Sequence, residues 1–417
     1  MFDLKSIRIG WFLGVRQLRR SSKWTTILIV VIMVLTFLNL VVISGILVGL
    51  IEGAVQANKV HFTSDIIISK LKENTTIEKS RQIISTIKNI PGVDSFSPRY
   101  VASGTIEANY KERINFNNVP EKVSAIIAGI NPQKEDEVTE LRDLVIEGEY
   151  LQPNDFDQVL VGALLLEKYL KLDSPGFLVL KGVDIGSKLR LEIGGVVREV
   201  TVKGITKAKV DEIDRRIFIN DFQLKSMMGQ SNLNVGEIAI KVKDEIPIEN
   251  VKNILMSNEL DRFANIQTFE EAQPPFLIDV KDTFNLLGII ISSIGLVVAA
   301  ITVFIVIFIN AITRRKYIGI MKAIGVNGKA IELSYVFQSL LYAVVGSTIG
   351  LILIYAVMVP YVAKNPINFP FSDGILVAPL DTTIIRVIVL ILVTAIAGYV
   401  PARIIVSQNT LDSILGR

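Results

Sequence analysis

The residues with the most suggestive spacing lie between Thr313 and Ala330, in the sequence TRRKYIGIMKAIGVNGKA. This segment separates two long stretches without charge, and it contains five basic residues, Arg314, Arg315, Lys316, Lys322 and Lys329. Four residues of this segment have the i, i+3, i+4, i+7 spacing of one helix face: Tyr317, Ile320, Met321 and Ile324. Gly325 then offers a helix stop. A basic loop of this kind can fix the orientation of a membrane protein, or its short helix can transmit force from a partner.

Motifs for enzymatic chemistry are absent from the sequence. The chain has one histidine, His61, and no cysteine, and it contains no HExxH, CxxC or GxSxG pattern. Gly328-Lys329 is not part of a phosphate loop, because Ala323 replaces the first glycine and Ala330 replaces the Ser/Thr. We interpret the acidic runs at 135–137 and 211–214 as solvated loops rather than a cation site. The chain is therefore expected to have no enzyme activity, no metal and no cofactor of its own.

The elements around this loop are apolar and long. Half of all residues are hydrophobic, and four stretches are long enough to cross a hydrocarbon core of roughly 30 Å. We predict membrane-spanning helices at residues 24–52, 283–312, 333–362 and 382–402. Within the spans the only charges are Glu52, the last residue of the first, and Arg386, near one end of the fourth. The lack of carboxylates and lysines at mid-membrane argues against an ion-coupled transporter.

The distribution of basic residues predicts the orientation. They precede the first span and fill the loop at 313–332, whereas the loop at 363–381 carries only Lys364. The positive-inside rule places both termini and the 313–332 loop in the cytoplasm, with residues 53–282 outside. Residues 1–23 carry an apolar stripe and predict a cytoplasmic helix lying in the membrane interface; the alternative is a merely basic flank. The stripe consists of Leu4, Ile7, Trp11, Val15 and Leu18.

The segment 53–282 predicts a large α+β domain between the first two spans. A strand–helix–strand pattern occurs near each end, at about 60–125 and about 235–275, and the residues between, about 126–234, predict a β-rich insertion. The pair Thr75 and Glu78 predicts a capping box that opens the first helix. A short helix is also predicted at 164–170.

Small residues recur along the spans at helix-packing spacing. They are Gly45 and Gly49 in the first span, Gly288 in the second, and Gly346 and Gly350 in the third. Such residues let two helix backbones approach closely. The partner helix belongs either to the same chain or, for Gly45 and Gly49 in particular, to a second copy in a dimer.

Three segments of the chain resemble one family. KYIGIMKAIGVNGKAI resembles the coupling segment of the MacB/LolC/FtsX-like permeases of ABC transporters, also called the type VII or mechanotransmission class. WFLGVRQLRRSSKWTTILIVV is similar to the family's approach to its first span, and YVPARIIVSQNTLDSIL to its C-terminal end. In the last segment Ile404 and Ile405 replace basic positions, and no proline follows Asp412. The runs VIEGEYL and VLVGALLLEKYLKL lean towards the LolC/LolE-like branch.

This resemblance implies a fold and a function. The fold is a membrane protein with four transmembrane helices, whose extracytoplasmic domain has Porter-like lobes and a β-rich Sabre-like insertion. The function is that of a permease subunit in the cell membrane, which transmits the motion of two copies of a cytoplasmic ABC ATPase subunit. The work is export or extraction of a lipoprotein, peptide, drug or lipid.

The resemblance also implies partners and site residues. The partners are a second related permease in a homodimer or heterodimer, membrane lipid, and an extracytoplasmic adaptor or carrier protein; no nucleic acid is expected. Coupling to the ATPase falls to Arg314, Arg315, Tyr317, Ile320, Met321, Lys322, Ile324 and Gly325. The alternative is an FtsX-like regulator that switches an extracytoplasmic partner such as a cell-wall hydrolase.

Overall fold

The structure, a computed structural model, describes residues 4–20, 23–111, 121–170, 178–229, 234–273, 275–369 and 372–409. Asp412 and the rest of the tail beyond residue 409 are not among them. The chain forms two compact units. We call them the helical unit, which comprises Met1–Glu52, Ile278–Asn368 and Asp373–Arg417, and the sheet unit, which comprises Gly53–Leu277 and Phe369–Ser372.

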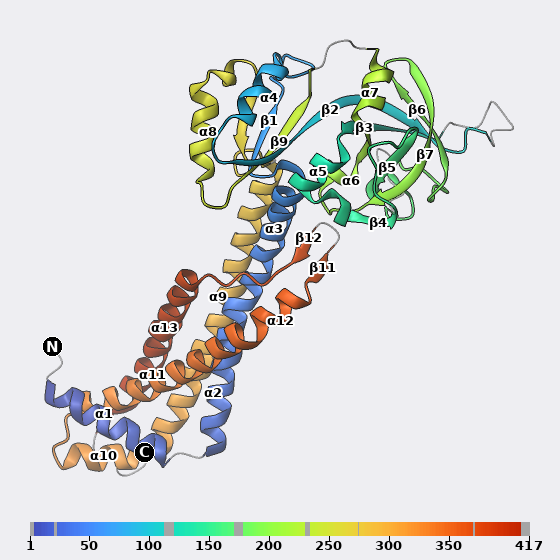
Figure 1. Ribbon diagram of the computed structural model, residues 1–417. Helices are drawn as coiled ribbons and strands as arrows, with labels where there is room; N and C mark the ends of the chain where they lie inside the picture. The colour runs from blue at the N-terminus through green and yellow to red at the C-terminus, as the bar shows by residue number, and fades with distance from the viewer. Residues whose placement is uncertain are drawn as a thin grey trace. The chain divides into compact units, whose positions relative to one another are not determined.

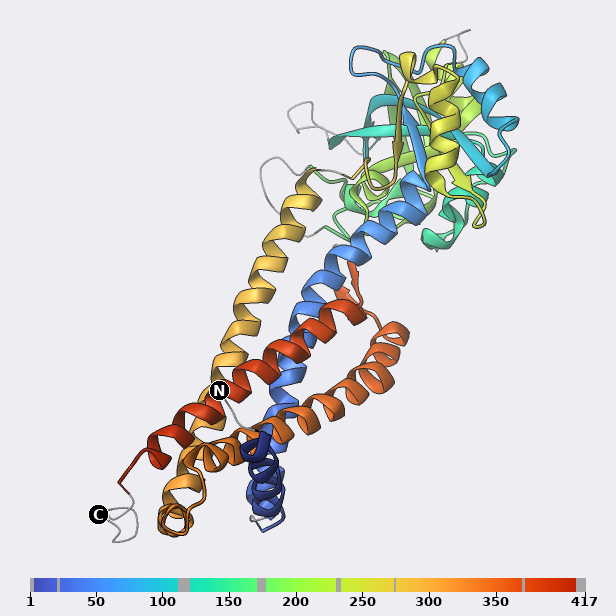
Figure 2. The ribbon, with the colours of Figure 1, turned by 90° about the vertical axis from the view of Figure 1, so that its left-hand side faces the viewer.

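Within the described residues, four helices are long and apolar enough to cross a membrane: Lys23–Thr63, Leu277–Thr313, Gly328–Lys364 and Leu380–Val406 (Figures 1 and 2). The first joins α2 (Lys23–Leu38), the π-helical turn η1 (Asn39–Ile43), α3 (Ser44–Asn58) and the π-helical turn η2 (Lys59–Thr63). The others are α9 (Pro275–Thr313), α11 (Gly328–Leu353) continued by η6 (Ile354–Met358) and α12 (Val359–Lys364), and α13 (Leu380–Val406). The first two helices run beyond the apolar stretches, because polar residues such as Glu52 and Asp282 end a hydrophobic run without ending a helix.

Helix α11 lies at the centre of the helical unit. It packs against α1 (Leu4–Arg19), α2 and α13. Its buried face is rich in small and polar residues, including Ser334, Ser339, Gly346 and Gly350. Small residues on a shared helix let several neighbours approach it closely. The short strands β11 (Ile367–Phe369) and β12 (Ser372–Gly374) pair in the connection to α13.

Part of the sheet unit is a four-stranded sheet in the order β10–β1–β9–β2. The strands are β1 (Ile66–Ser69), β2 (Val93–Glu107), β9 (Glu237–Val242) and β10 (Asn265–Thr268), and the helices are α4 (Ser80–Lys88) and α8 (Ile248–Ser257). Ile68 shares one buried core with Ile83 and Ile87 of α4 and with Val251 and Leu255 of α8. Both predicted strand–helix–strand patterns are therefore present, but they interleave in one sheet rather than forming separate lobes.

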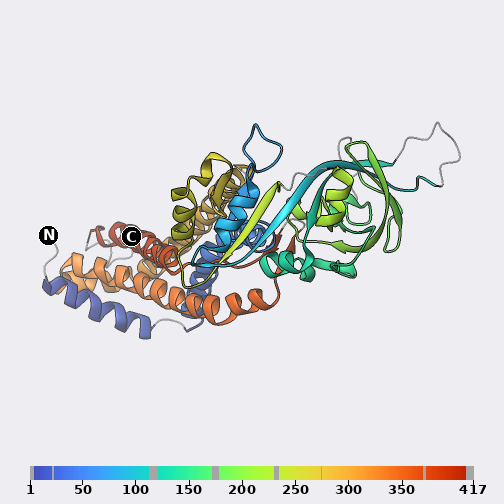
Figure 3. The same ribbon diagram turned by 45° about the horizontal axis from the view of Figure 1, so that its top comes forward.

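Strand β2 continues from this sheet into a closed barrel (Figure 3). The barrel order is β2–β3–β8–β5–β7–β6, and β6 closes it by pairing with both β7 and β2. The added strands are β3 (Lys122–Ile130), β5 (Gln158–Gly162), β6 (Lys188–Ile193), β7 (Val196–Thr206) and β8 (Arg216–Asn220), with β4 (Val145–Gly148) on β7. Closure removes the exposed strand edges of an open sheet. The predicted β-rich insertion, about 126–234, supplies β5, β6, β7, β8 and part of β3, but the barrel also includes β2, which was predicted to belong to the preceding lobe.

The remaining helices of the sheet unit are short: α5 (Pro132–Thr139), α6 (Asp211–Asp214), α7 (Asp221–Met228), and the 3-10 turns η3 (Leu141–Leu144), η4 (Ala163–Leu165) and η5 (Leu260–Arg262). The predicted helix at 164–170 is wrong beyond η4. The backbone there pairs with a neighbouring segment instead: Leu180 N donates to Leu165 O (2.8 Å), and Glu167 N donates to Leu180 O (3.0 Å).

The predicted capping box is also wrong, because α4 begins only at Ser80. The preceding residues bond across to residues 234–235 rather than starting a helix. Ile77 N donates to Val235 O (2.8 Å), and Val235 N donates to Ser80 Oγ (3.2 Å). Thr75 and Glu78 therefore lie outside the helix that they were expected to cap.

Candidate functional site

The loop between α9 and α11 folds as a short helix, α10 (Arg315–Ala323), with defined stops. Gly325 N donates to Lys322 O (3.0 Å) and Val326 N donates to Met321 O (3.0 Å), the bond pair of a Schellman motif. Gly325 has φ +92°, which glycine adopts without a Cβ penalty. Asn327 then caps α11, since its side chain accepts from Lys329 N (3.0 Å). The predicted stop at Gly325 is confirmed.

The two faces of α10 have different surroundings. Ile318 is 1% exposed and lies in the core of the helical unit, with Met321 partly buried against the same core. On the opposite face Tyr317 is 68% exposed, Ile320 42% and Ile324 74%. The predicted apolar face thus divides: Met321 packs inwards, while the other three form an apolar surface that the chain leaves open. We call Tyr317, Ile320 and Ile324 the open face of α10.

Lys322 fixes α10 to the end of α13. Its Nζ donates to Val406 O (2.9 Å) and to Gln408 O (2.8 Å). Carbonyls at a helix C-terminus lack intrahelical donors and carry the negative end of the helix dipole, so an ammonium group stabilises them. Lys322 therefore acts as an anchor within the chain. Arg314 and Arg315 stand at the N-terminal end of α10, as its N-cap and first residue.

Three of the predicted packing glycines lie where two helices of the chain meet. A Cβ on Gly346 would be 2.4 Å from Met33 Cβ, and one on Gly350 would be 2.4 Å from Phe37 Cδ1, so α11 has no room there for a side chain against α2. Gly288 of α9 faces Ser44, whose Oγ would be 3.1 Å from an added Cβ. These glycines set the close approach of α2, α3, α9 and α11.

Gly45 and Gly49 contact a loop of the same chain. A Cβ on Gly45 would be 2.7 Å from Val377 O, and one on Gly49 would be 1.8 Å from Ile375 O. Val377 N also donates to Gly45 O (3.2 Å). The segment before α13 therefore occupies the surface for which a second copy was the alternative partner.

Helix α1 packs on α11 through its small residues. Gly10 and Gly14 are buried, and a Cβ on either would meet the α11 backbone, at Ala330 O (3.0 Å) and Ser334 O (2.8 Å) respectively. Trp11 meets Phe337 edge-on, with ring centroids 5.4 Å apart. Ile7 and Trp11 of the predicted apolar stripe remain exposed, whereas Leu18, at its other end, packs against the core of the helical unit.

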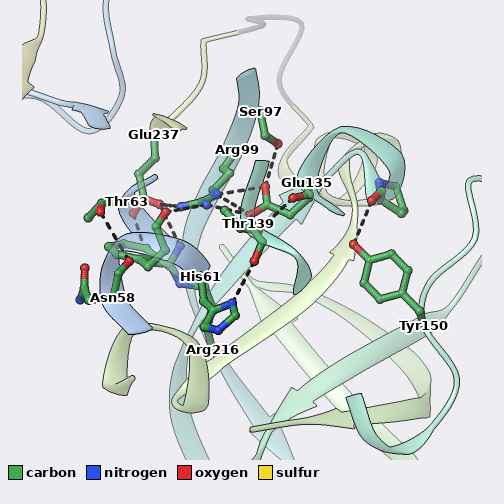
Figure 4. A network of polar contacts seen from close by, with 12 residues as sticks. Asn58, His61, Thr63, Ser97, Arg99, Glu135, Thr139, Tyr150, Arg216 and Glu237 are labelled. Carbon is green, nitrogen blue, oxygen red and sulfur yellow. Dashed lines mark hydrogen bonds and ion pairs between the residues drawn. The ribbon is translucent and has the colours of Figure 1, made fainter. Parts of the chain in front are cut away.

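A second constellation, a buried ion cluster, lies in the sheet unit (Figure 4). Arg99 of β2 and Glu135 of α5 are 1% and 0% exposed, and their Nη2 and Oε1 atoms are 2.7 Å apart. Glu237 of β9 accepts from Arg216 Nη1 (2.8 Å) and lies 3.5 Å from Arg99 Nη1. Ser97 Oγ donates to Glu135 Oε2 (2.7 Å). The cluster thus joins α5 to three strands by charge-assisted hydrogen bonds.

The end of the first long helix is bonded to the same cluster. Arg99 Nη2 donates to Phe62 O (2.8 Å), and the Phe62 ring lies 5.2 Å from the Arg99 guanidinium and 5.0 Å from that of Arg216. His61 Nδ1 lies 3.1 Å from Thr139 O. The turn η2 therefore ends on a network in which each charge has a partner of opposite sign.

Electrostatics favour the charged forms of Arg99 and Glu237. Burial alone would lower the pKa of Arg99, but the carboxylates of Glu135 and Glu237 outweigh it and the pKa is raised. Burial alone would raise the pKa of Glu237, but Arg216 and Arg99 outweigh it and that pKa is lowered. A buried ion pair of this kind holds only while both partners are present.

The sequence interpretation missed this cluster. It took the acidic runs at 135–137 and 211–214 as solvated loops, yet Glu135 is fully buried and Asp214 is 2% exposed. Asp214 accepts from Ala208 N (2.6 Å) and Lys209 N (2.8 Å). The available signal was Arg99, a charge inside an otherwise strand-like run, which requires a buried partner.

The helical unit is similar to part of a known protein family. Residues 289–410 match the model of the FtsX-like permease C-terminal domain, which covers α10, α11 and α13. The ABC transporter permease YtrF of Bacillus subtilis is 26% identical over 254 residues, 55% of this chain and 56% of that protein. The macrolide export ATP-binding/permease protein MacB of Campylobacter jejuni is 23% identical over 230 residues, 54% of this chain and 33% of that protein. The matched part therefore spans about half of YtrF and a third of MacB.

Among solved structures, the extracellular domain of the noncanonic ABC-type transporter YknZ from Gram-positive bacteria is similar to part of the chain. The superposition has a TM-score of 0.33 at 16% identity, and it covers 49% of this chain and 98% of that one. A likeness this weak carries no argument about the site.

Proposed function

We propose that this chain, an FtsX-like permease whose relatives are ABC transporter permeases, couples a cytoplasmic ATPase to movement of its sheet unit on the other side of the membrane. The work would be export of a substrate, or its extraction from the outer face of the membrane. The ATP-binding site would lie outside this sequence, which has no phosphate loop.

The open face of α10 is the observation that carries this proposal. Tyr317, Ile320 and the C-cap residue Ile324 lie one or two turns apart on a helix between two spans, and each is 42–74% exposed. Exposed apolar residues clustered on one helix face are typical of a protein contact. The positive-inside rule places this loop in the cytoplasm, so the expected partner is a cytoplasmic protein.

The attachment of α10 supports a mechanical role. The Schellman stop, the cap at Asn327 and the bonds from Lys322 to the end of α13 hold α10 against the helical unit. Ile318 and Met321 pack into the same core as α2, α9, α11 and α13. A partner that pulls on the open face would therefore move several spans together rather than a loose loop.

The buried ion cluster supports the proposed transmission of motion from the membrane-spanning helices to the sheet unit. The first long helix, Lys23–Thr63, ends in η2, which bonds to Arg99 and to Thr139 O. Displacement of η2 would thus act directly on β2, the strand shared by the four-stranded sheet and the barrel. An FtsX-like regulator would use the same path to switch a partner protein instead of moving a substrate.

The decisive experiment changes the open face without changing the anchored one. Ile324→Glu places a carboxylate in the proposed contact, where an unpaired buried charge costs about 3 kcal/mol or more and weakens binding at least roughly hundredfold. We expect ATP hydrolysis activity to co-purify with the tagged wild-type chain from its own cells and to be lost with the variant. Membrane insertion should be unchanged, because Ile324 faces away from the core.

Ala323→Glu is the matched control, since Ala323 is exposed on the same helix but lies outside the open face. It adds the same charge and should retain the ATPase. Equal retention by Ile324→Glu and Ala323→Glu would exclude the open face as the coupling surface.

A further inference from the structure

Three of the four apolar stretches, 24–51, 283–313 and 333–363, carry no charge, and the fourth, 382–402, carries only Arg386. It lies in α13, a helix on which the neighbouring residues Ile384, Ile385 and Ile388 are exposed. A charged side chain in a membrane-spanning helix is costly, and it usually marks a binding or functional site. The question is therefore what balances this guanidinium.

The guanidinium of Arg386 lies near the N-terminal end of α13. Arg386 is six residues beyond Leu380, the first residue of α13, and hence roughly 9 Å along the helix. Its Nη2 donates to Ser44 Oγ (2.7 Å). The next residue, Gly45, accepts from Val377 N in the loop that precedes α13. The Arg386 side chain therefore extends towards the level of the loop that precedes α13.

Nothing in the described chain neutralises this charge. Ser44 satisfies one of the five N–H donors of the guanidinium, and no carboxylate of the described residues forms an ion pair with Arg386. The α13 dipole does not help, because the start of a helix carries partial positive charge. Ser44 is buried, and its Oγ lies against Gly288 of α9, so it holds the guanidinium in place from the protein side.

We propose that Arg386, held in place by Ser44, binds the phosphate of a phospholipid headgroup at the interface where α13 begins. A guanidinium matches phosphate oxygens with paired N–H donors and keeps its charge at all physiological pH values. The acyl chains of the same lipid would lie along the exposed isoleucines of α13. This site follows from the membrane-spanning helices alone and does not depend on an ATPase partner.

The test uses the full chain in nanodiscs that contain equal amounts of phosphatidylglycerol and a phosphate-free galactosyl diacylglycerol, with retained lipids counted by native mass spectrometry. We expect the wild-type protein to retain phosphatidylglycerol in preference, and Arg386→Gln to lose one bound phospholipid. Lys364→Gln is the matched control, because Lys364 is exposed at the end of α12, on the same side of the helical unit. It should retain that lipid.

Each other outcome has a defined meaning. Equal lipid retention by the wild type and Arg386→Gln, or equal loss in Arg386→Gln and Lys364→Gln, would overturn the proposal. Displacement of the lipid by excess inorganic phosphate would overturn it too, by showing a site for a soluble anion. If Arg386→Gln fails to insert, Arg386→Lys replaces it: the charge stays, the paired donors are lost, and the preference for phosphatidylglycerol should fall.

Discussion

The helical unit and the sheet unit pack their interiors in different ways. In the helical unit, helices meet through glycine and serine, as where Gly346 contacts Met33 and Ser292 Oγ donates to Leu40 O (3.3 Å). In the sheet unit, the apolar cores enclose a fully paired ion cluster around Arg99 and Glu135.

The difference reflects the surroundings of each unit. Between helices in lipid there is no hydrophobic drive, so stability comes from close backbone approach, which large side chains prevent. A unit that folds in water gains stability by burying apolar surface and tolerates buried charges only when each has a partner. The sheet unit should therefore be sensitive to loss of a charge, and the helical unit to gain of a methyl group.

The largest effect is expected from removal of one ion of the cluster. Glu135→Ala leaves Arg99 buried without its main carboxylate, which costs about 3–5 kcal/mol in the free energy of unfolding. Hydrogen exchange of the β2 amides in the full protein measures this loss. Glu167→Ala breaks the exposed pair with Lys181 (3.8 Å) and should change stability by only about 0–1 kcal/mol. Similar costs for the two variants would contradict the contrast between buried and exposed charge.

A smaller effect is expected from the titration of Asp214 in the sheet unit. Burial raises the pKa of Asp214 to about 6 from its ordinary value of 3.8, despite two bonds from backbone N–H groups that favour the carboxylate. The native state therefore holds the proton more tightly than the unfolded state. The stabilisation is full below about pH 3.8, falls as pH rises, and is lost above about pH 6.

This titration amounts to about 3 kcal/mol of unfolding free energy across that range. The measurement is the pH dependence of β8 hydrogen exchange for wild type minus Asp214→Asn, a variant that cannot titrate at this position. A difference that does not change with pH would show that the pKa of Asp214 is the same in the native and unfolded states.

The sequence could predict what depends on local pattern. Uncharged stretches of sufficient length predicted the spans, short strand-forming runs predicted β1 and β9, and Gly325 predicted the end of α10. The resemblance to FtsX-like ABC transporter permeases is confirmed by the family match over residues 289–410 and by the relatives. These features are set by residues close together in the sequence.

What the sequence could not predict depends on distant pairing. Closure of the barrel by β6 on β2 joins residues more than eighty positions apart, such as Thr105 and Glu192. Glu135 looks like any solvated acid until Arg99 is placed beside it by the fold. Likewise the periodicity of α10 grouped Met321 with the open face, because a helix pattern shows which residues share a stripe but not where the neighbouring core ends.

The smallest effect is expected in the helical unit, from one added methyl group. Gly346→Ala would place a Cβ 2.4 Å from Met33 Cβ. Neither atom can rotate away, because each is attached directly to its backbone, so α2 and α11 must separate. Overpacking of this kind costs about 1–3 kcal/mol. Val345→Ala is the control, since Val345 is on the same turn but exposed, and it should change stability little. Steric trapping in bicelles measures both. If Gly346→Ala is as stable as Val345→Ala, close approach of these helices does not hold the helical unit together, and the contrast with the sheet unit fails at its weaker side.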